Sequence, residues 1–161
     1  MSAPEPATQN APSAGPLLVV IDPVARRSDG ESVRIAKDVL CGGADGVKVC
    51  LPDSAEEFTR ALARRGSRRP VVVGDDRALL RAVGGLHRER ELAASVLSLV
   101  PVGSVTTLAQ SLGVPAGTVA AARAVLDGVP RRLDLLVDDS DGVVLSELRI
   151  PAVRVGAKAG A

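Results

Sequence analysis

The chain has 161 residues, the length of one domain, and its 20 basic and 19 acidic residues leave a formal net charge of +1. Hydrophobic residues make up 46% of the sequence, yet they include one Phe and neither Trp nor Tyr. A platform that stacks the bases of single-stranded nucleic acid needs several exposed rings, so the composition excludes that class. The balanced charge also supplies no global field that would steer a polyanion.

The N-terminal segment shows no apolar periodicity. Residues 1–16 are rich in Pro, Ala and Ser. This composition cannot bury enough apolar surface to offset the conformational entropy lost on ordering, so we expect a disordered tail there. The start lacks the basic and apolar regions of a signal peptide, and the only cysteines are Cys41 and Cys50. We therefore expect a reduced, cytoplasmic location.

Apolar runs alternate with amphipathic segments from residue 17 onward. LLVVI at 17–21 is a continuous apolar run that stops at Asp22-Pro23, which is typical of a strand covered on both faces. Similar runs predict strands at 47–51, 71–73 and 96–100. Helical spacing predicts helices at 28–40, 53–64, 77–86, 106–112 and 116–126, and turn-forming residues at 138–142 predict a hairpin between strands at 133–137 and 143–150.

Strands that alternate with helices at this spacing predict the α/β class, as a three-layer α/β/α sandwich with a mainly parallel sheet. We place this domain at residues 17–150 and expect a flexible tail of small residues at 151–161. Ligands of such sheets bind beyond the carboxyl ends of the strands. The loops that begin at Asp22, Gly74 and Pro101 therefore form the candidate site.

Three motifs follow one another along the second half of the domain. VVVGDDRALL begins at Val71, LVPVGSVTTLAQSLGVP at Leu99 and VLDGVPRRLDLL at Val125. In this order they resemble the diacylglycerol kinase catalytic-domain family of lipid kinases, which is related in fold to the NAD kinases. That family has an Asn-Pro turn after its first strand, a GGDGT loop and a P-L-G-T-G-N-D-x-A-R segment. The likeness covers about residues 17–150.

The resemblance implies that these loops hold a nucleotide. Family enzymes transfer the terminal phosphoryl group of ATP, with Mg²⁺, to a lipid hydroxyl, and a second, β-rich domain that these residues do not include supplies much of the lipid site. A nucleotide and a lipid are therefore the implied substrates. Carried over to the matching positions, the implied nucleotide-binding residues are Asp22, Pro23, Gly74, Asp75, Asp76, Arg77, Gly103 and Ser104.

The phosphate loop departs from the family pattern. Asp75 and Arg77 stand at the second and third Gly of GGDGT, and Ala78 stands at its Thr. Bare backbone lets several N–H groups converge on phosphate oxygens, whereas a carboxylate ~4 Å from a phosphate charge is repelled by roughly 4 kcal/mol at an effective dielectric of about 20. We therefore expect a weakly active or inactive pseudoenzyme that serves in binding or assembly, unless Mg²⁺ intervenes or Arg77 itself reaches the phosphates.

Other residues have two interpretations each. Asp76 and Ser104 could contact the nucleotide, or cap the helices that follow them. The RRGSRR segment could contact anionic lipid head groups at a membrane surface, or form a solvated helix end. Its cations are Arg64, Arg65, Arg68 and Arg69.

Residues 106–126 also resemble the helix-turn-helix of bacterial repressors. In the second of the two helices, only Thr118 and Arg123 could hydrogen-bond a base edge or a phosphate. We therefore rank a DNA-binding regulator below the kinase-like interpretation and expect no nucleic-acid partner.

Overall fold

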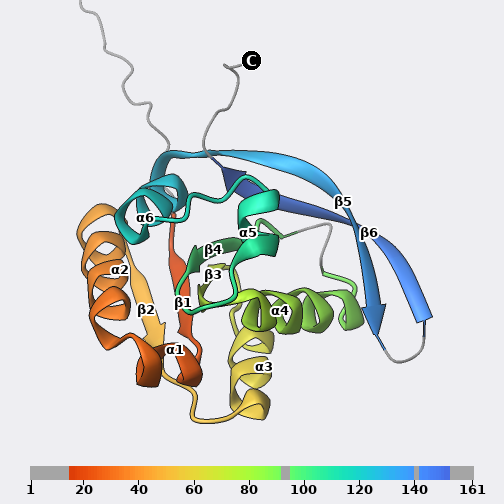
Figure 1. Ribbon diagram of the computed structural model, residues 1–161, viewed down its shortest axis with the longest axis horizontal. Coiled ribbons are helices and arrows are strands. Elements are labelled where there is room, and N and C mark those ends of the chain that lie inside the picture. The colour runs from red at the N-terminus through yellow and green to blue at the C-terminus, as the bar shows by residue number, and fades with distance from the viewer. Residues whose placement is uncertain (1–14, 92–94, 140–141, 153–161) are drawn as a thin grey trace, which may run out of the picture.

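A four-stranded parallel sheet organises the chain (Figure 1). The computed structural model describes residues 15–91, 95–139 and 142–152. The strands are β1 (Leu17–Ile21), β2 (Val47–Cys50), β3 (Arg69–Gly74) and β4 (Ser98–Pro101), in the order β2-β1-β3-β4. All five residues of β1 are buried, because the strand lies inside a parallel sheet that is covered on both faces.

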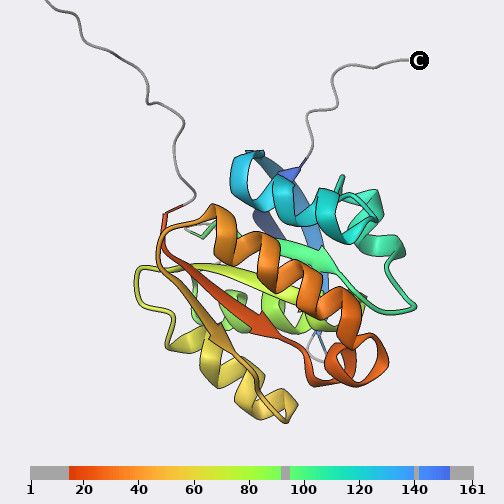
Figure 2. The same ribbon diagram turned by 90° about the vertical axis from the view of Figure 1, so that its left-hand side faces the viewer.

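Helices cover both faces of this sheet, as Figure 2 shows. On one face α2 (Gly30–Gly43) packs against α6 (Thr118–Asp127), and on the other α3 (Ala55–Ala63) packs against α4 (Asp76–Arg88). The short helices α1 (Pro23–Ser28) and α5 (Thr107–Ser111) follow β1 and β4. This arrangement confirms the predicted α/β class, with its layered helices and mainly parallel sheet.

The structure contains one helix that the sequence did not predict. The segment expected as a single helix at 28–40 follows a separate helix, α1, in which Pro23 occupies the first turn and Asp22 is the N-cap. Proline is favoured there because its missing N–H needs no partner at a helix start. Asp29 then interrupts the helix with φ −153° and ψ 69°, and its carboxylate caps α2 through the Ser32 N–H.

The last two strands form a separate antiparallel hairpin, β5 (Val129–Asp139) and β6 (Gly142–Ala152), which arches away from the sheet in Figure 1. The hairpin is confirmed, and both strands are longer than predicted. β6 runs to Ala152, two residues beyond the predicted domain end, while residues 1–14 and 153–161 of the expected tails lie outside the described residues. Within the described ranges, none of the helices has the length and apolar character needed to cross a bilayer.

Candidate functional site

The loops after β1, β3 and β4 meet at the carboxyl edge of the sheet, as their position in the sequence predicts. Backbone hydrogen bonds connect them. The Asp22 N–H donates to the Val73 carbonyl (2.9 Å), and the Val102 N–H donates to the Gly74 carbonyl (2.9 Å). The Asp76 N–H donates to the Val105 carbonyl (2.8 Å). The structure therefore brings the three candidate loops together.

Asp22 connects the first loop to α1 and α4. One carboxylate oxygen accepts the Val24 N–H (3.1 Å), and the other accepts Nη1 of Arg81 (3.1 Å). The Asp22 side chain is only 5% exposed, and the Arg81 guanidinium also lies 5.5 Å from the centre of the Phe58 ring. Both carboxylate oxygens are thus occupied by protein groups, and Pro23 beside them is buried in α1.

Gly74 is the one residue of the family loop whose small size the structure requires. A Cβ added there would lie 2.7 Å from the Cβ of Ala78 and 3.0 Å from the Cβ of Asp22. Real Cβ atoms do not approach so closely, so a larger residue would push α4 away from β1. Glycine at this position serves the packing of the strand, the helix and the first loop.

Asp75 is the N-cap of α4. Its Oδ1 accepts the N–H groups of Arg77 (3.1 Å) and Ala78 (3.2 Å), the second and third residues of the helix. The first helical residue, Asp76, donates its N–H to Val105. The first three N–H groups of α4 are therefore all hydrogen-bonded within the protein. These are the groups that a helix N-terminus ordinarily offers to an anion.

Asp76 caps a different helix from the one that directly follows it in the sequence. It is 7% exposed, and its carboxylate accepts the N–H groups of Leu108 (2.9 Å) and Ala109 (3.1 Å) in α5. The expectation that Asp76 caps the helix beginning near Arg77 is wrong, because Asp75 does so. Asp76 instead holds α5 against α4 from 32 residues away in the sequence.

The remaining predicted residues lie at the rim. Arg77 is exposed on α4, and Ser104 is exposed in the loop after β4. Ser104 does not cap α5, whose N-cap is Thr106. Gly103 has φ +132°, a conformation that side chains rarely adopt, and a Cβ there would lie 3.0 Å from the Cβ of Asp75. The loop after β4 therefore packs directly onto Asp75.

A pocket of about 330 Å³ lies between these loops and α1. Its polar side chains are Ser28, Asp29, Asp75 and Ser104, with no cation in the lining. Sequence reasoning missed Ser28 and Asp29, although an Asp just before an apolar helical pattern is a typical N-cap. Hydrogen bonds from the Ser32 side chain and backbone hold the pKa of Asp29 below its usual value. The pocket is therefore acidic at neutral pH.

The four arginines of the RRGSRR segment do not form one exposed patch. Arg65 is 9% exposed and forms ion pairs with Glu91 (3.0 Å) and Glu89 (4.0 Å). Nη1 of Arg68 donates to the carbonyls of Gly46 (2.6 Å) and Leu17 (3.2 Å). Arg64 is exposed.

Arg69 is half-buried, and desolvation lowers its pKa. Of the four cations, only Arg64 is therefore exposed enough to meet a membrane surface freely.

The segment that resembles a helix-turn-helix is part of the α/β domain. α6 packs against α2 and β4, and its buried residues are Ala121, Ala122, Ala124 and Val125. Arg123 is exposed and Thr118 is half-buried.

Throughout the described ranges, no group of three or more His, Cys, Asp or Glu side chains is placed to hold a metal ion.

Comparisons with known proteins agree with this architecture. The family model of the diacylglycerol kinase catalytic domain matches residues 16–137. A relative from Chromohalobacter salexigens, named "Probable lipid kinase YegS-like", is 30% identical over 101 residues, which cover 63% of this chain and 30% of that protein.

Solved structures show the same fold. Two chains, each described as a "putative diacylglycerol kinase from Bacillus anthracis str. Sterne", superpose with TM-scores of 0.64 and 0.63 at 18% identity. They match 75% of this chain, which covers 44% and 42% of theirs. The chain thus spans less than half the length of these proteins. Because the family model covers most of the chain, the chain belongs to the diacylglycerol kinase catalytic-domain family.

Proposed function

We propose that this chain is a lipid-kinase-family domain that does not bind nucleotide phosphates and serves as a non-catalytic binding or assembly module. The observation that carries the proposal is the closed N-terminus of α4. In the family, ATP supplies the phosphoryl group that passes to a lipid hydroxyl, and Mg²⁺ assists by stabilising charge. Here the N–H groups of Arg77 and Ala78, which would meet phosphate oxygens, are already bonded to Asp75.

The electrostatics of the acidic pocket support the same proposal. Asp29 and Asp75 line it, and none of its lining residues is a cation. A carboxylate ~4 Å from a phosphate charge is repelled by roughly 4 kcal/mol at an effective dielectric of about 20. One charge-assisted hydrogen bond returns about 1.5–3 kcal/mol, which is less than this cost. The residues present therefore do not fit a nucleotide triphosphate.

Two substitutions at position 75 test the proposal. Asp75→Gly frees the N–H groups of Arg77 and Ala78, and glycine at an N-cap costs only a few tenths of a kcal/mol of stability. Asp75→Asn removes the charge but leaves an oxygen that still accepts those N–H groups. Thermal melting with increasing MgATP reports binding, because a ligand of the native state raises the melting temperature by mass action.

We expect no rise in melting temperature for the wild type or Asp75→Asn, and a concentration-dependent rise for Asp75→Gly. A rise for the wild type would overturn the proposal. Equal rises for both variants would show that the charge of Asp75, rather than its occupation of the N–H groups, excludes the nucleotide. Adding Arg77→Gly and Ala78→Thr to the Asp75→Gly variant brings the loop closer to the GGDGT pattern of the family.

A further inference from the structure

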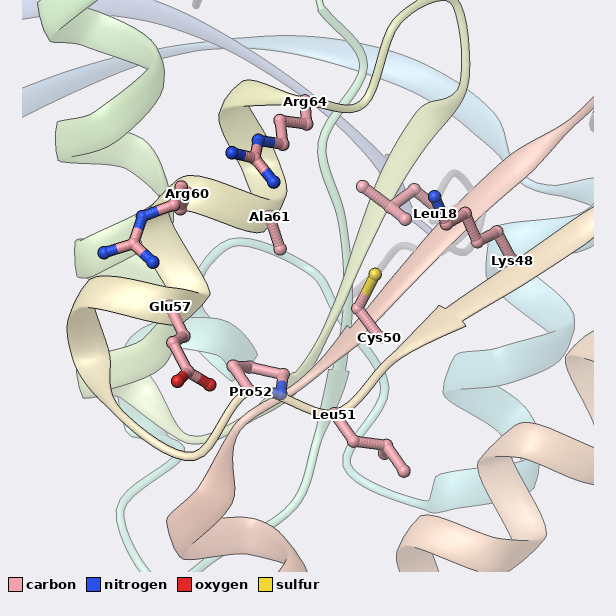
Figure 3. Close-up of a pocket in the computed structure, with 9 residues that line it drawn as sticks. All are labelled: Leu18, Lys48, Cys50, Leu51, Pro52, Glu57, Arg60, Ala61 and Arg64. Atoms are coloured by element: carbon pink, nitrogen blue, oxygen red, sulfur yellow. The ribbon is translucent and has the colours of Figure 1, made fainter.

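A second pocket, of about 340 Å³, lies between the edge strand β2 and helix α3 (Figure 3). It shares no lining residue with the acidic pocket beside Asp75. Its walls come from β1, β2, the segment after β2 and α3. Any ligand here would meet a different set of side chains from those of the family's nucleotide loops, so this inference does not depend on the proposed function.

Three cations line this second pocket, and one carboxylate accompanies them. The cations are Lys48, Arg60 and Arg64, and the carboxylate is Glu57, which leaves a net charge of +2. Figure 3 shows the ammonium group of Lys48 and the guanidinium of Arg64 on opposite sides of the space above Leu18. The Arg60 guanidinium points away from the strands, at the rim of the pocket.

These cations are not neutralised within the described part of the chain. Arg26, Arg34, Arg65 and Arg81 all form ion pairs there. Lys48, Arg60 and Arg64 form none, and their side chains donate no hydrogen bond to a described residue.

Glu57 does not offset the three cations directly. Its Oε1 accepts the Asp53 N–H (2.9 Å), and the carboxylate forms no ion pair with a described residue. With the charge of Glu57 counted, the pocket keeps a net charge of +2 that no ion pair within the described residues neutralises.

The floor of the pocket is apolar. Leu18 is 2% exposed, and Cys50 and Ala61 are half-buried beside it. Figure 3 shows the Cys50 sulfur and the Ala61 methyl group directed into the same space from β2 and α3. Leu51, 50% exposed, adds an apolar surface at the rim. A ligand that fills this pocket therefore combines an anionic group with an apolar body.

We propose that this second pocket binds a phosphomonoester that carries an apolar group. A phosphomonoester bears a charge of about −1.5 to −2 at pH 7, which matches the net +2 of the lining, whereas a carboxylate supplies only one negative charge. Arg64 and Lys48 are placed to contact the phosphate oxygens from opposite sides, and guanidinium groups suit phosphate geometry. The apolar group contacts Leu18, Cys50 and Ala61.

Protection of Cys50 from a thiol reagent measures binding directly. The other cysteine, Cys41, is exposed on α2, so a Cys41→Ser background confines labelling to Cys50. The probe is hexyl phosphate, and inorganic phosphate and hexanol are the partial ligands. We expect hexyl phosphate to slow the labelling of Cys50 about tenfold at saturation, inorganic phosphate to bind more weakly, and hexanol not to protect.

Variants of the cations test the charge. Arg64→Ala and Lys48→Ala each remove a group without a partner in the described structure, so we expect unchanged melting temperatures and hexyl phosphate affinities lowered about tenfold. The matched control is Arg123→Ala, which removes the same charge from an exposed position on α6. We expect this variant to keep the wild-type affinity. High salt should weaken the binding as well.

Vesicles distinguish a free ester from a lipid head group. Phosphatidylcholine vesicles containing phosphatidic acid present the phosphomonoester at a membrane, and vesicles containing phosphatidylglycerol present a phosphodiester. Protection by hexyl phosphate alone supports a free ester, and additional protection by phosphatidic acid vesicles supports a lipid source. If neither ligand protects Cys50, or if both Arg64→Ala and Lys48→Ala are protected as well as the Arg123→Ala control, the proposal is overturned.

Discussion

Two pockets of nearly equal volume share no lining residue, and they carry opposite charge. The acidic pocket at the carboxyl edge, about 330 Å³, contains Asp29 and Asp75 without a cation. The basic pocket between β2 and α3, about 340 Å³, contains Lys48, Arg60 and Arg64 with one carboxylate. The pocket at the candidate nucleotide loops therefore carries negative charge, and a pocket outside the family motifs carries positive charge.

The carboxylates of the acidic pocket differ from the cations of the basic pocket because they stabilise the fold. Asp29 and Asp75 cap α2 and α4, and the neighbouring Asp22 and Asp76 hold α1 and α5. The three cations of the basic pocket form no ion pair with a described residue. Substitutions at the carboxyl edge should therefore change stability, and substitutions in the basic pocket should change binding alone.

The largest effect on stability is expected at Asp76. Asp76→Ala removes the acceptor of two α5 N–H groups in a buried position, and we expect the free energy of unfolding to fall by about 3 kcal/mol. Asp76→Asn keeps one accepting oxygen and should lose less. Chemical denaturation measures both. A loss below ~0.5 kcal/mol for Asp76→Ala would mean that this carboxylate is not structural, and the contrast between the pockets would weaken.

The next effect is expected at Gly103, whose loop packs on Asp75. Gly103→Ala forces a side chain into φ +132° and into contact with Asp75, which should cost about 1–3 kcal/mol. Gly42→Ala is the control, because nothing lies within 4 Å of that position in α2 and helical Ala is favoured by about 0.5–1 kcal/mol. Equal stabilities of the two variants would show that the loop after β4 has room to move away from Asp75.

The smallest effect concerns Asp29 in acid. Hydrogen bonds from Ser32 lower the pKa of Asp29 in the folded state. Asp29 therefore contributes stability at pH values above the pKa that it has in the unfolded chain. In the unfolded chain, Asp29 has the ordinary aspartate pKa of about 3.9. The contribution to stability is lost as the pH falls below this value and then through the lower pKa of the folded state. Asp29→Asn still caps α2 but does not titrate, so its unfolding free energy should fall less over this range. Urea denaturation at several acidic pH values checks the difference, and identical curves would contradict the assignment.

Much of the fold could be predicted from residues that are close in sequence. Apolar runs such as LLVVI at 17–21 predicted the strands, since a strand buried on both faces must be apolar throughout. The helix α1 was missed because Asp22-Pro23 was interpreted only as the end of a strand. The same dipeptide is an N-cap followed by a first-turn proline, which is also a helix start.

The chemistry of the candidate site depended on contacts that sequence spacing does not reveal. Asp75 and Asp76 are adjacent and both precede a helix, but only the folded structure shows that Asp76 reaches α5. The basic pocket likewise combines Lys48 of β2 with Arg64 at the C-cap of α3, and both line one pocket only because the chain crosses over the sheet. Arg65 and Arg68, which lie one and four residues after Arg64, instead form ion pairs or hydrogen bonds within the protein.

The most direct test of the account follows the backbone amide signals of Arg77 and Ala78 by nuclear magnetic resonance while MgATP is added to the wild-type protein. Because Asp75 already accepts both N–H groups, we predict that these signals stay in place at millimolar nucleotide, and that they shift only in Asp75→Gly. Saturable shifts of both amides in the wild type would show phosphate bound at the start of α4 and would contradict the account.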